Sequence, residues 1–178
     1  SGSIWIVDES SLCRYNSTDF RLLNRLYTER PITANYMDAT RNRMWIACSG
    51  EIFLFDFYTE KFEELPLEVS HNSRLVNESV TIIHPYRQNA LLLNSFDHGL
   101  FLLDTESGKI LKHDENGVPF DAPEFGIFHI FTDSQSNLWL GAYDQGVAVK
   151  FNSPTRFNNY KYLVSLTKGK SVMATDVD

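Results

Sequence analysis

Two short segments of this chain combine the side-chain types that bind sugars. Phe96-Asp97-His98 and Tyr143-Asp144-Gln145 each place an aromatic ring, a carboxylate and a further polar group directly before a glycine. Aromatic faces can stack on sugar rings, and carboxylates accept hydrogen bonds from hydroxyl groups. The same residues also suit tight turns between strands, in which glycine supplies a positive φ angle. Both interpretations stay open, although turn chemistry is the commoner explanation of such residues.

No other motif predicts a catalytic, cofactor or metal site. None of the five histidines pairs with another at the spacing of metal ligands, and neither a G-x-S-x-G motif nor a phosphate-binding glycine loop is present. We expect His84 to lie at the end of a strand, as Asp38 and Asp133 do in other parts of the chain. Cys13 and Cys48 are expected to be small apolar residues in strands, and a disulfide between them stays possible.

The composition is that of a globular domain with a sizeable core. The chain has 178 residues, of which 43% are hydrophobic and 13% aromatic, and the aromatic content favours β-structure. The net charge of −7 argues against binding to nucleic acids or to anionic lipid surfaces. No apolar run approaches the roughly 18–20 residues that span a bilayer. We therefore expect no membrane contact within this segment.

The two segments belong to copies of one repeat, which must position them. Asn137-Leu138-Trp139-Leu140-Gly141-Ala142 and the residues that follow it resemble the stretch from Ala90 to Leu100. Met44-Trp45-Ile46-Ala47 and Ser3-Ile4-Trp5-Ile6-Val7 are further copies. A period of roughly 40–50 residues with short β-type segments is typical of propeller blades. We therefore predict an all-β fold, a β-propeller segment of about four four-stranded blades.

The expected repeats form one propeller region over residues 1–178. Each repeat should hold a first strand with a polar end, a second strand that carries tryptophan, an alternating third strand and an outer fourth strand. An Asp or Asn opens the turn before each outer strand, where its side chain can bond the backbone two residues on. The repeats are placed at approximately 1–30, 31–78, 79–125 and 126–169. A last strand over 170–178 would complete the first blade if it paired with the first strand.

The fourth copy resembles a known family. Asn137-Leu138-Trp139-Leu140-Gly141-Ala142 and the following residues to Val147 are similar to the two-component regulator propeller repeat, whose consensus reads roughly G-N-L-W-I-G-T-x-x-G-L. The copies around Trp45 and Trp5 match more weakly. In the third copy Leu92 replaces the tryptophan and Asn94 the glycine.

This resemblance implies a fragment of the periplasmic sensor region of a Bacteroides-type hybrid two-component histidine kinase. Its function would be signal transduction by carbohydrate sensing, in response to oligosaccharides released from polysaccharides, with neighbouring blades or domains of the parent sensor as partners. The segment would not itself be an enzyme, because the kinase lies outside it. The alternatives are a glycan-processing propeller enzyme, such as a lyase or hydrolase, and a propeller scaffold that binds a protein. The four blades could close alone, form a homodimer or be an arc cut from a larger ring.

Overall fold

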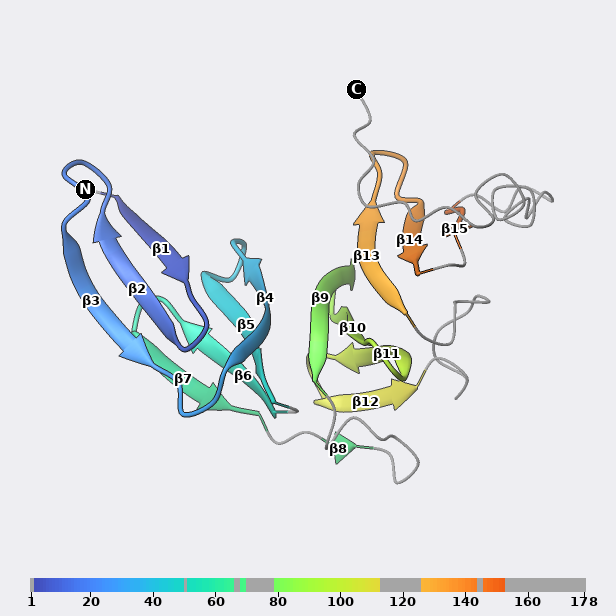
Figure 1. Cartoon of the computed structure of the whole chain (residues 1–178), viewed down its shortest axis with the longest axis horizontal. Helices are drawn as coiled ribbons and strands as arrows, with labels where there is room; N and C mark the ends of the chain where they lie inside the picture. Colours follow the sequence, from blue (N-terminus) through green and yellow to red (C-terminus); the bar gives the residue numbers. More distant parts are fainter. Residues whose placement is uncertain are drawn as a thin grey trace.

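A computed structural model describes residues 2–49, 51–65, 68–69, 79–112, 126–143 and 146–152. These residues form four β-sheets that follow one another along the chain, and the pairing within them is antiparallel except at one outer edge (Figure 1). The structure confirms the predicted all-β fold of propeller-like blades. No helix among these residues is long and apolar enough to cross a membrane. The expected outer strand of the fourth repeat and the last strand over 170–178 lie outside the described residues.

The sheets are numbered here as blades 1 to 4 in chain order. In each blade the strands adjacent in the sequence are also neighbours in the sheet. Blade 1 comprises β1 (Ser3–Val7), β2 (Ser11–Asn16) and β3 (Leu22–Tyr27). Blade 2 comprises β4 (Ile32–Asp38), β5 (Arg43–Cys48), β6 (Glu51–Asp56) and β7 (Lys61–Glu64). Blade 3 comprises β9 (Val80–Arg87), β10 (Ala90–Ser95), β11 (Gly99–Asp104) and β12 (Lys109–Lys112), and blade 4 comprises β13 (Ile127–Thr132), β14 (Leu138–Ala142) and β15 (Gly146–Lys150).

One strand has no counterpart in the predicted repeat. β8 (Glu68–Val69) follows blade 2 in the sequence but pairs in parallel with β12, at the outer edge of blade 3. Blade 3 therefore has five strands, whereas blade 2 has four. Blade 1 begins with the tryptophan-bearing strand, as expected, and three of its strands are described.

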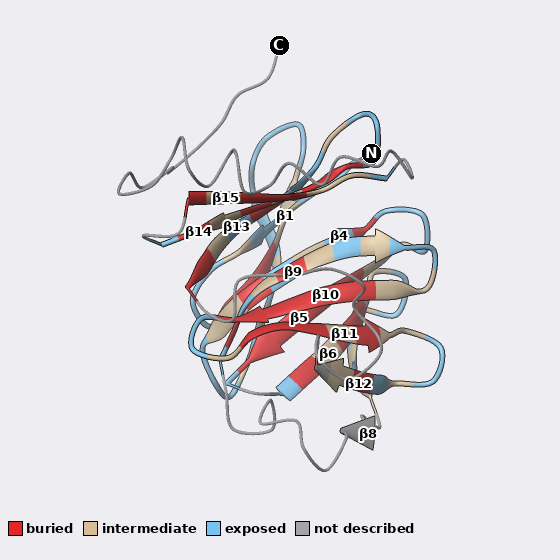
Figure 2. Ribbon diagram, turned by 90° about the vertical axis from the view of Figure 1, so that its right-hand side faces the viewer, coloured by how far each residue is buried: buried red, intermediate tan, exposed pale blue. Residues whose placement is uncertain are grey.

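The tryptophan-bearing strand keeps the same orientation in every copy. Side chains alternate between the two faces of a strand, so each blade has a forward face towards the next blade in the sequence and a back face towards the preceding one. Trp5 packs from blade 1 onto blade 2, and Trp45 packs from blade 2 onto blade 3. Met44 and Ile46 alternate with Trp45 and pack back onto blade 1. Because both faces of the middle blades are covered, β5 and β10 are almost wholly buried (Figure 2).

Phe55 lies at the centre of an aromatic cluster that joins blades 1 and 2. Its side chain has no exposed surface. The ring centroids of Trp5, Phe57 and Phe62 lie 5.2, 5.2 and 5.1 Å from that of Phe55. The contacts with Trp5 and Phe57 are edge-to-face, a favourable arrangement for aromatic pairs. Leu12 of β2 completes this cluster from blade 1.

The turns before the outer strands have the predicted chemistry. Asn16, Asp56 and Asp104 each open such a turn and accept hydrogen bonds from the backbone amides two and three residues on. For Asp56 these distances are both 2.9 Å. Hydrogen bonds to the charged form, the backbone amide of Thr59 first among them, hold the pKa of Asp56 below its ordinary value. These turns are therefore structural.

Both cysteines have the expected role as small buried residues in strands. Cys13 lies in β2 and Cys48 in β5, and both thiols are buried and free. Burial of the Cys48 thiol, with a smaller effect of Glu51, raises its pKa. It therefore stays a neutral thiol at physiological pH and behaves as an apolar group.

The prediction for His84 was wrong. β9 continues to Arg87, so His84 does not lie at the strand end. His84 pairs with Leu92, just as Tyr36 pairs with Trp45 in blade 2. A register shift between Ala90 and Leu91 makes β9 longer than the other first strands. Instead of bonding turn amides, the His84 ring is within 2.8 Å of the Thr132 hydroxyl of blade 4.

His84 is expected to make the stability of the chain depend on pH. Burial of its ring, and secondarily the charge of His129, lowers the pKa of His84 to about 4. The unfolded chain takes up a proton as the pH falls through about 6.5, while the folded chain takes one up only near pH 4. As the pH falls from about 6.5 to about 4, the free energy of unfolding should therefore fall by on the order of 2 kcal/mol. Above this interval the contribution of neutral His84 to stability should be fully present. Urea unfolding across this pH range tests the effect: a His84→Gln variant should lose this slope, and an unchanged slope would contradict the assignment.

Candidate functional site

The first predicted sugar-binding segment and Tyr143 of the second lie at equivalent places after β10 and β14. Phe96, Asp97 and His98 join β10 to β11, and Tyr143 stands at the end of β14 before β15. The glycines that follow the two segments have positive φ angles, 71° at Gly99 and 77° at Gly146. Phe96, Asp97 and His98 therefore form a tight turn closed by Gly99, as the turn interpretation predicted. We call the face that carries this turn and Tyr143 the turn face.

The backbone brings the two turns side by side. The Gly126 amide donates a hydrogen bond of 2.7 Å to the Phe96 carbonyl, and the Tyr143 amide donates one of 2.8 Å to the Gly126 carbonyl. The rings of Phe96 and Tyr143 are both exposed. Asp97 is exposed and His98 is half-buried. Asp144 and Gln145 lie outside the described residues, so the second turn contributes Tyr143 alone to the described geometry.

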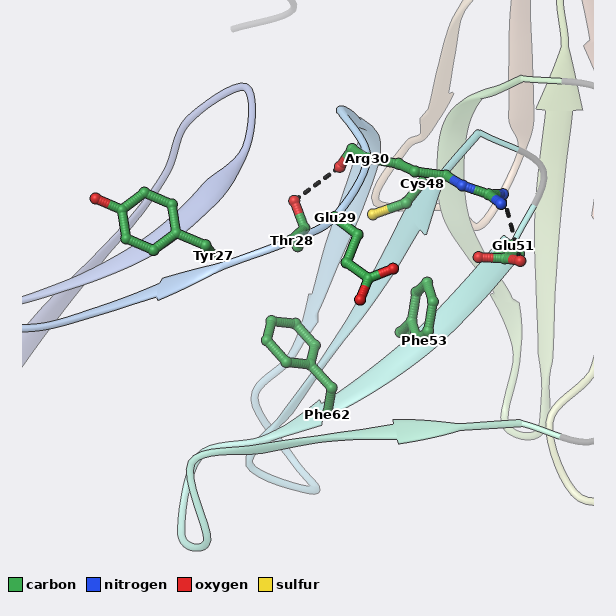
Figure 3. Close-up of a pocket in the computed structure, with 8 residues that line it drawn as sticks. All are labelled: Tyr27, Thr28, Glu29, Arg30, Cys48, Glu51, Phe53 and Phe62. Atoms are coloured by element: carbon green, nitrogen blue, oxygen red, sulfur yellow. Dashed lines mark hydrogen bonds and ion pairs between the residues drawn. The ribbon is translucent and has the colours of Figure 1, made fainter.

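A pocket of about 380 Å³ opens on the same face, between blades 1 and 2 (Figure 3). Its position follows from the repeat, because Glu51 directly follows the β5–β6 turn, the equivalent in blade 2 of the β10–β11 turn. A volume of this size is in the usual range for small-molecule sites. The lining residues come from the end of β3, the connection to β4, and strands β5 to β7: Tyr27, Thr28, Glu29, Arg30, Cys48, Glu51, Phe53 and Phe62.

Aromatic rings form one wall of this pocket. Phe53 and Phe62 meet edge to face, with centroids 6.5 Å apart and an interplanar angle of 79°. Both are half-buried against the core between blades 1 and 2, so part of each ring still faces the pocket. Tyr27 lies at the edge of the pocket, and its exposed ring points away from Phe53 and Phe62, beside the Arg25 guanidinium. The neutral thiol of Cys48 adds an apolar surface to the lining.

Charged groups oppose the aromatic wall. The Glu29 carboxylate points into the space beside Phe53 and Phe62 (Figure 3). Arg30 forms an ion pair of 3.3 Å with Glu51, and both side chains are about half exposed. The Thr28 hydroxyl donates a hydrogen bond of 2.7 Å to the Arg30 carbonyl, which fixes the shape of the connection. A ligand in this pocket would meet apolar ring surface on one side and acceptors and donors on the other.

No motif in the sequence points directly to this pocket. Its lining residues are spread from position 27 to position 62, and no motif links them. They converge only because the end of β3 meets the neighbouring blade. One available signal was the run Tyr27-Thr28-Glu29-Arg30, a cluster of aromatic and charged residues in a connection between blades. Connections of this kind commonly carry function.

The described residues contain no group of three or more His, Cys, Asp or Glu side chains placed to hold a metal ion. Two carboxylates, Glu29 and Glu51, do line the pocket, and the second is paired with Arg30. The arrangement is suited to binding a polar ligand that also has an apolar face.

The sequence matches no established protein family and no curated protein sequence. The fold is similar to that of the extracellular domain of the hybrid two-component system BT3049 from B. thetaiotaomicron, with 19% identity and a TM-score of 0.63 over 87% of this chain. The extracellular domain of BT4673 from the same organism gives 22% identity and a TM-score of 0.59 over 85% of this chain. The chain spans only 21% and 20% of the length of these two domains.

Computationally designed proteins share the same arrangement of strands. Ika4 is 14% identical, with a TM-score of 0.54, and the alignment covers 82% of this chain and 81% of Ika4. Ika8 is 13% identical, with a TM-score of 0.55, and this chain spans 41% of its length. At these identities the comparisons establish the fold.

Proposed function

We propose that this chain is the ligand-recognition segment of an extracytoplasmic sensor and that it binds short oligosaccharides. The observation that carries the proposal is the pocket between blades 1 and 2, in which Phe53 and Phe62 flank the Glu29 carboxylate. Sugar rings have an apolar face that stacks on aromatic rings and hydroxyl groups that donate to carboxylates. The exposed rings of Phe96 and Tyr143 on the same face extend the surface available to a longer chain.

Two similar structures support the sensor role. BT3049 and BT4673 are extracellular domains of bacterial signalling systems, and the repeat in this chain resembles the two-component regulator propeller repeat. The segment would then lie in the periplasm, as part of the sensor region of an inner-membrane histidine kinase. Its role is binding rather than catalysis. Because the pocket is lined by both blade 1 and blade 2, a bound sugar would favour one packing of these blades over another and so bias a signalling equilibrium.

Titration calorimetry with neutral oligosaccharides of glucose, xylose and mannose tests this function. We expect saturable binding of at least one of them, and a Glu29→Gln variant should weaken it roughly tenfold because a charged acceptor for sugar hydroxyl groups is lost. Glu29 is exposed, so this substitution should leave the fold intact. Glu63→Gln is the matched control, because Glu63 is exposed on β7 and does not line the pocket.

The remaining variants separate the possible sites. If Tyr143→Ala weakens binding and Glu29→Gln does not, the turns of blades 3 and 4 hold the ligand instead of the pocket. Release of reducing sugar ends during the titration would favour the glycan-processing enzyme. No binding of any of these sugars by the folded chain would contradict oligosaccharide recognition.

A further inference from the structure

The carboxylate that enters the pocket between blades 1 and 2 is not paired with a cation of the described residues. Glu29 is exposed in the connection between β3 and β4, and its carboxylate is flanked by the rings of Phe53 and Phe62 (Figure 3). None of the ion pairs within the described part of the chain includes Glu29. The Glu51 carboxylate, which also lines the pocket, is paired with Arg30. Glu29 therefore gives the described lining a net negative charge.

A second guanidinium lies near the edge of the pocket and is directed elsewhere. The Arg25 guanidinium carbon lies 6.0 Å from the centroid of the Tyr27 ring, which points away from Phe53 and Phe62 (Figure 3). The Nε atom of Arg25 also donates a hydrogen bond of 3.1 Å to the Cys13 sulfur of β2. These contacts hold Arg25 on blade 1, and it is not part of the described lining.

The two phenylalanine rings beside Glu29 favour a positively charged ligand. Phe53 and Phe62 meet at 79°, so they present differently oriented ring surfaces to the same space. The face of an aromatic ring is the negative part of its quadrupole and attracts ammonium groups. Both rings are half-buried, and their apolar surface strengthens the attraction between the neighbouring carboxylate and a cation. An ammonium group therefore gains from the rings and from the carboxylate, whereas a hydroxyl group gains mainly from the carboxylate.

We propose that this pocket selects sugars that carry a free, protonated amine over neutral and N-acetylated sugars. The proposal rests on the recognition of oligosaccharides inferred above, and it names the class of sugar. The ammonium group of such a ligand donates a charge-assisted hydrogen bond to Glu29 and lies against the ring of Phe53 or Phe62. The net charge of −7 on the chain further favours the approach of a cationic ligand.

Three disaccharides with one linkage test the selection by charge. The β-1,4-linked dimer of glucosamine, its N-acetylated form and cellobiose differ only in the group on the second carbon of each ring. In calorimetry at about pH 6, where amines of this kind are protonated, we expect the glucosamine dimer to bind at least about tenfold more tightly than the other two. Equal affinity for the three disaccharides would overturn this proposal and leave oligosaccharide recognition standing. Cyclohexylamine that binds as tightly as the glucosamine dimer, with no binding of the neutral sugars, would support selection by charge and contradict recognition of the sugar.

Two substitutions of opposite sign locate the ammonium group. Glu29→Gln should weaken binding of the glucosamine dimer at least about tenfold and remove its advantage over the N-acetylated form. Arg30→Gln leaves Glu51 unpaired and should strengthen binding of the glucosamine dimer about threefold, with no gain for cellobiose. Glu63→Gln, on β7 and outside the pocket, is the matched control, and circular dichroism checks that each variant folds. A preference for the glucosamine dimer that survives in Glu29→Gln would overturn the assignment.

Discussion

A Phe55→Ala variant is expected to lose about 4 kcal/mol of its free energy of unfolding. Phe55 is fully buried between blades 1 and 2, and its ring contacts those of Trp5, Phe57 and Phe62. Alanine would remove the buried ring and leave a cavity that the rigid strands on either side cannot close. Since domains of this size are stable by roughly 5–15 kcal/mol, the loss is a large fraction of the total.

Denaturant unfolding measures this effect, and two variants calibrate it. Phe55→Leu keeps most of the buried volume and should cost less than half as much as alanine. Tyr58→Ala removes an aromatic ring from the same blade at an exposed position and should have little effect. The cluster between blades 1 and 2 would not be a main source of stability if Phe55→Ala and Tyr58→Ala unfolded at the same denaturant concentration.

An Asn94→Asp variant is expected to be destabilised by about 3 kcal/mol at neutral pH. Asn94 has no exposed surface, and its side-chain amide donates to the Ile127 carbonyl at 2.8 Å and to the Thr81 hydroxyl at 3.0 Å. The bond to Ile127 joins blade 3 to blade 4. Aspartate has almost the same shape, but it replaces the donor with a carboxylate that faces a carbonyl oxygen and must be buried with its charge.

The pH dependence separates this charge effect from a simple change of packing. Burial raises the pKa of a carboxyl group, so the new aspartate should take up a proton as the pH falls, and the difference from the parent chain should shrink. Asn35→Asp is the matched control, because Asn35 lies exposed on β4. Equal stability of Asn94→Asp and Asn35→Asp at neutral pH would show that the buried amide does not hold blades 3 and 4 together.

Local features of the fold could be predicted because their causes are local. The alternating side-chain pattern around Trp45 and Trp139 follows from the two faces of a strand. In the structure, the strands that carry these tryptophans, β5 and β14, both have a buried face. The turns at Asp56 and Asp104 depend on side-chain bonds to amides two and three residues away. Neither feature requires knowledge of the neighbouring sheet.

The errors and omissions concern irregular strand pairing within a blade and contacts between blades. His84 was misplaced because register shifts in the pairing of β9 with β10 move the strand end to Arg87, and such shifts leave no clear mark in the sequence. Asn94 stood out as a departure from the glycine of the repeat, but its partner, the Ile127 carbonyl, lies 33 residues away. The pocket at Tyr27 and Phe62 likewise exists only once two blades meet.

The order of strands within the sheets has a consequence for how such a molecule changes over evolutionary time. Among the described strands, every pairing except that of β8 with β12 joins strands consecutive in the chain. One continuous stretch of gene therefore encodes almost all of one sheet. A duplication of that stretch adds a sheet whose two faces already match its neighbours, so the array can lengthen in single steps. Each new copy is then free to acquire its own turn residues while the strands keep the pattern that holds the array together.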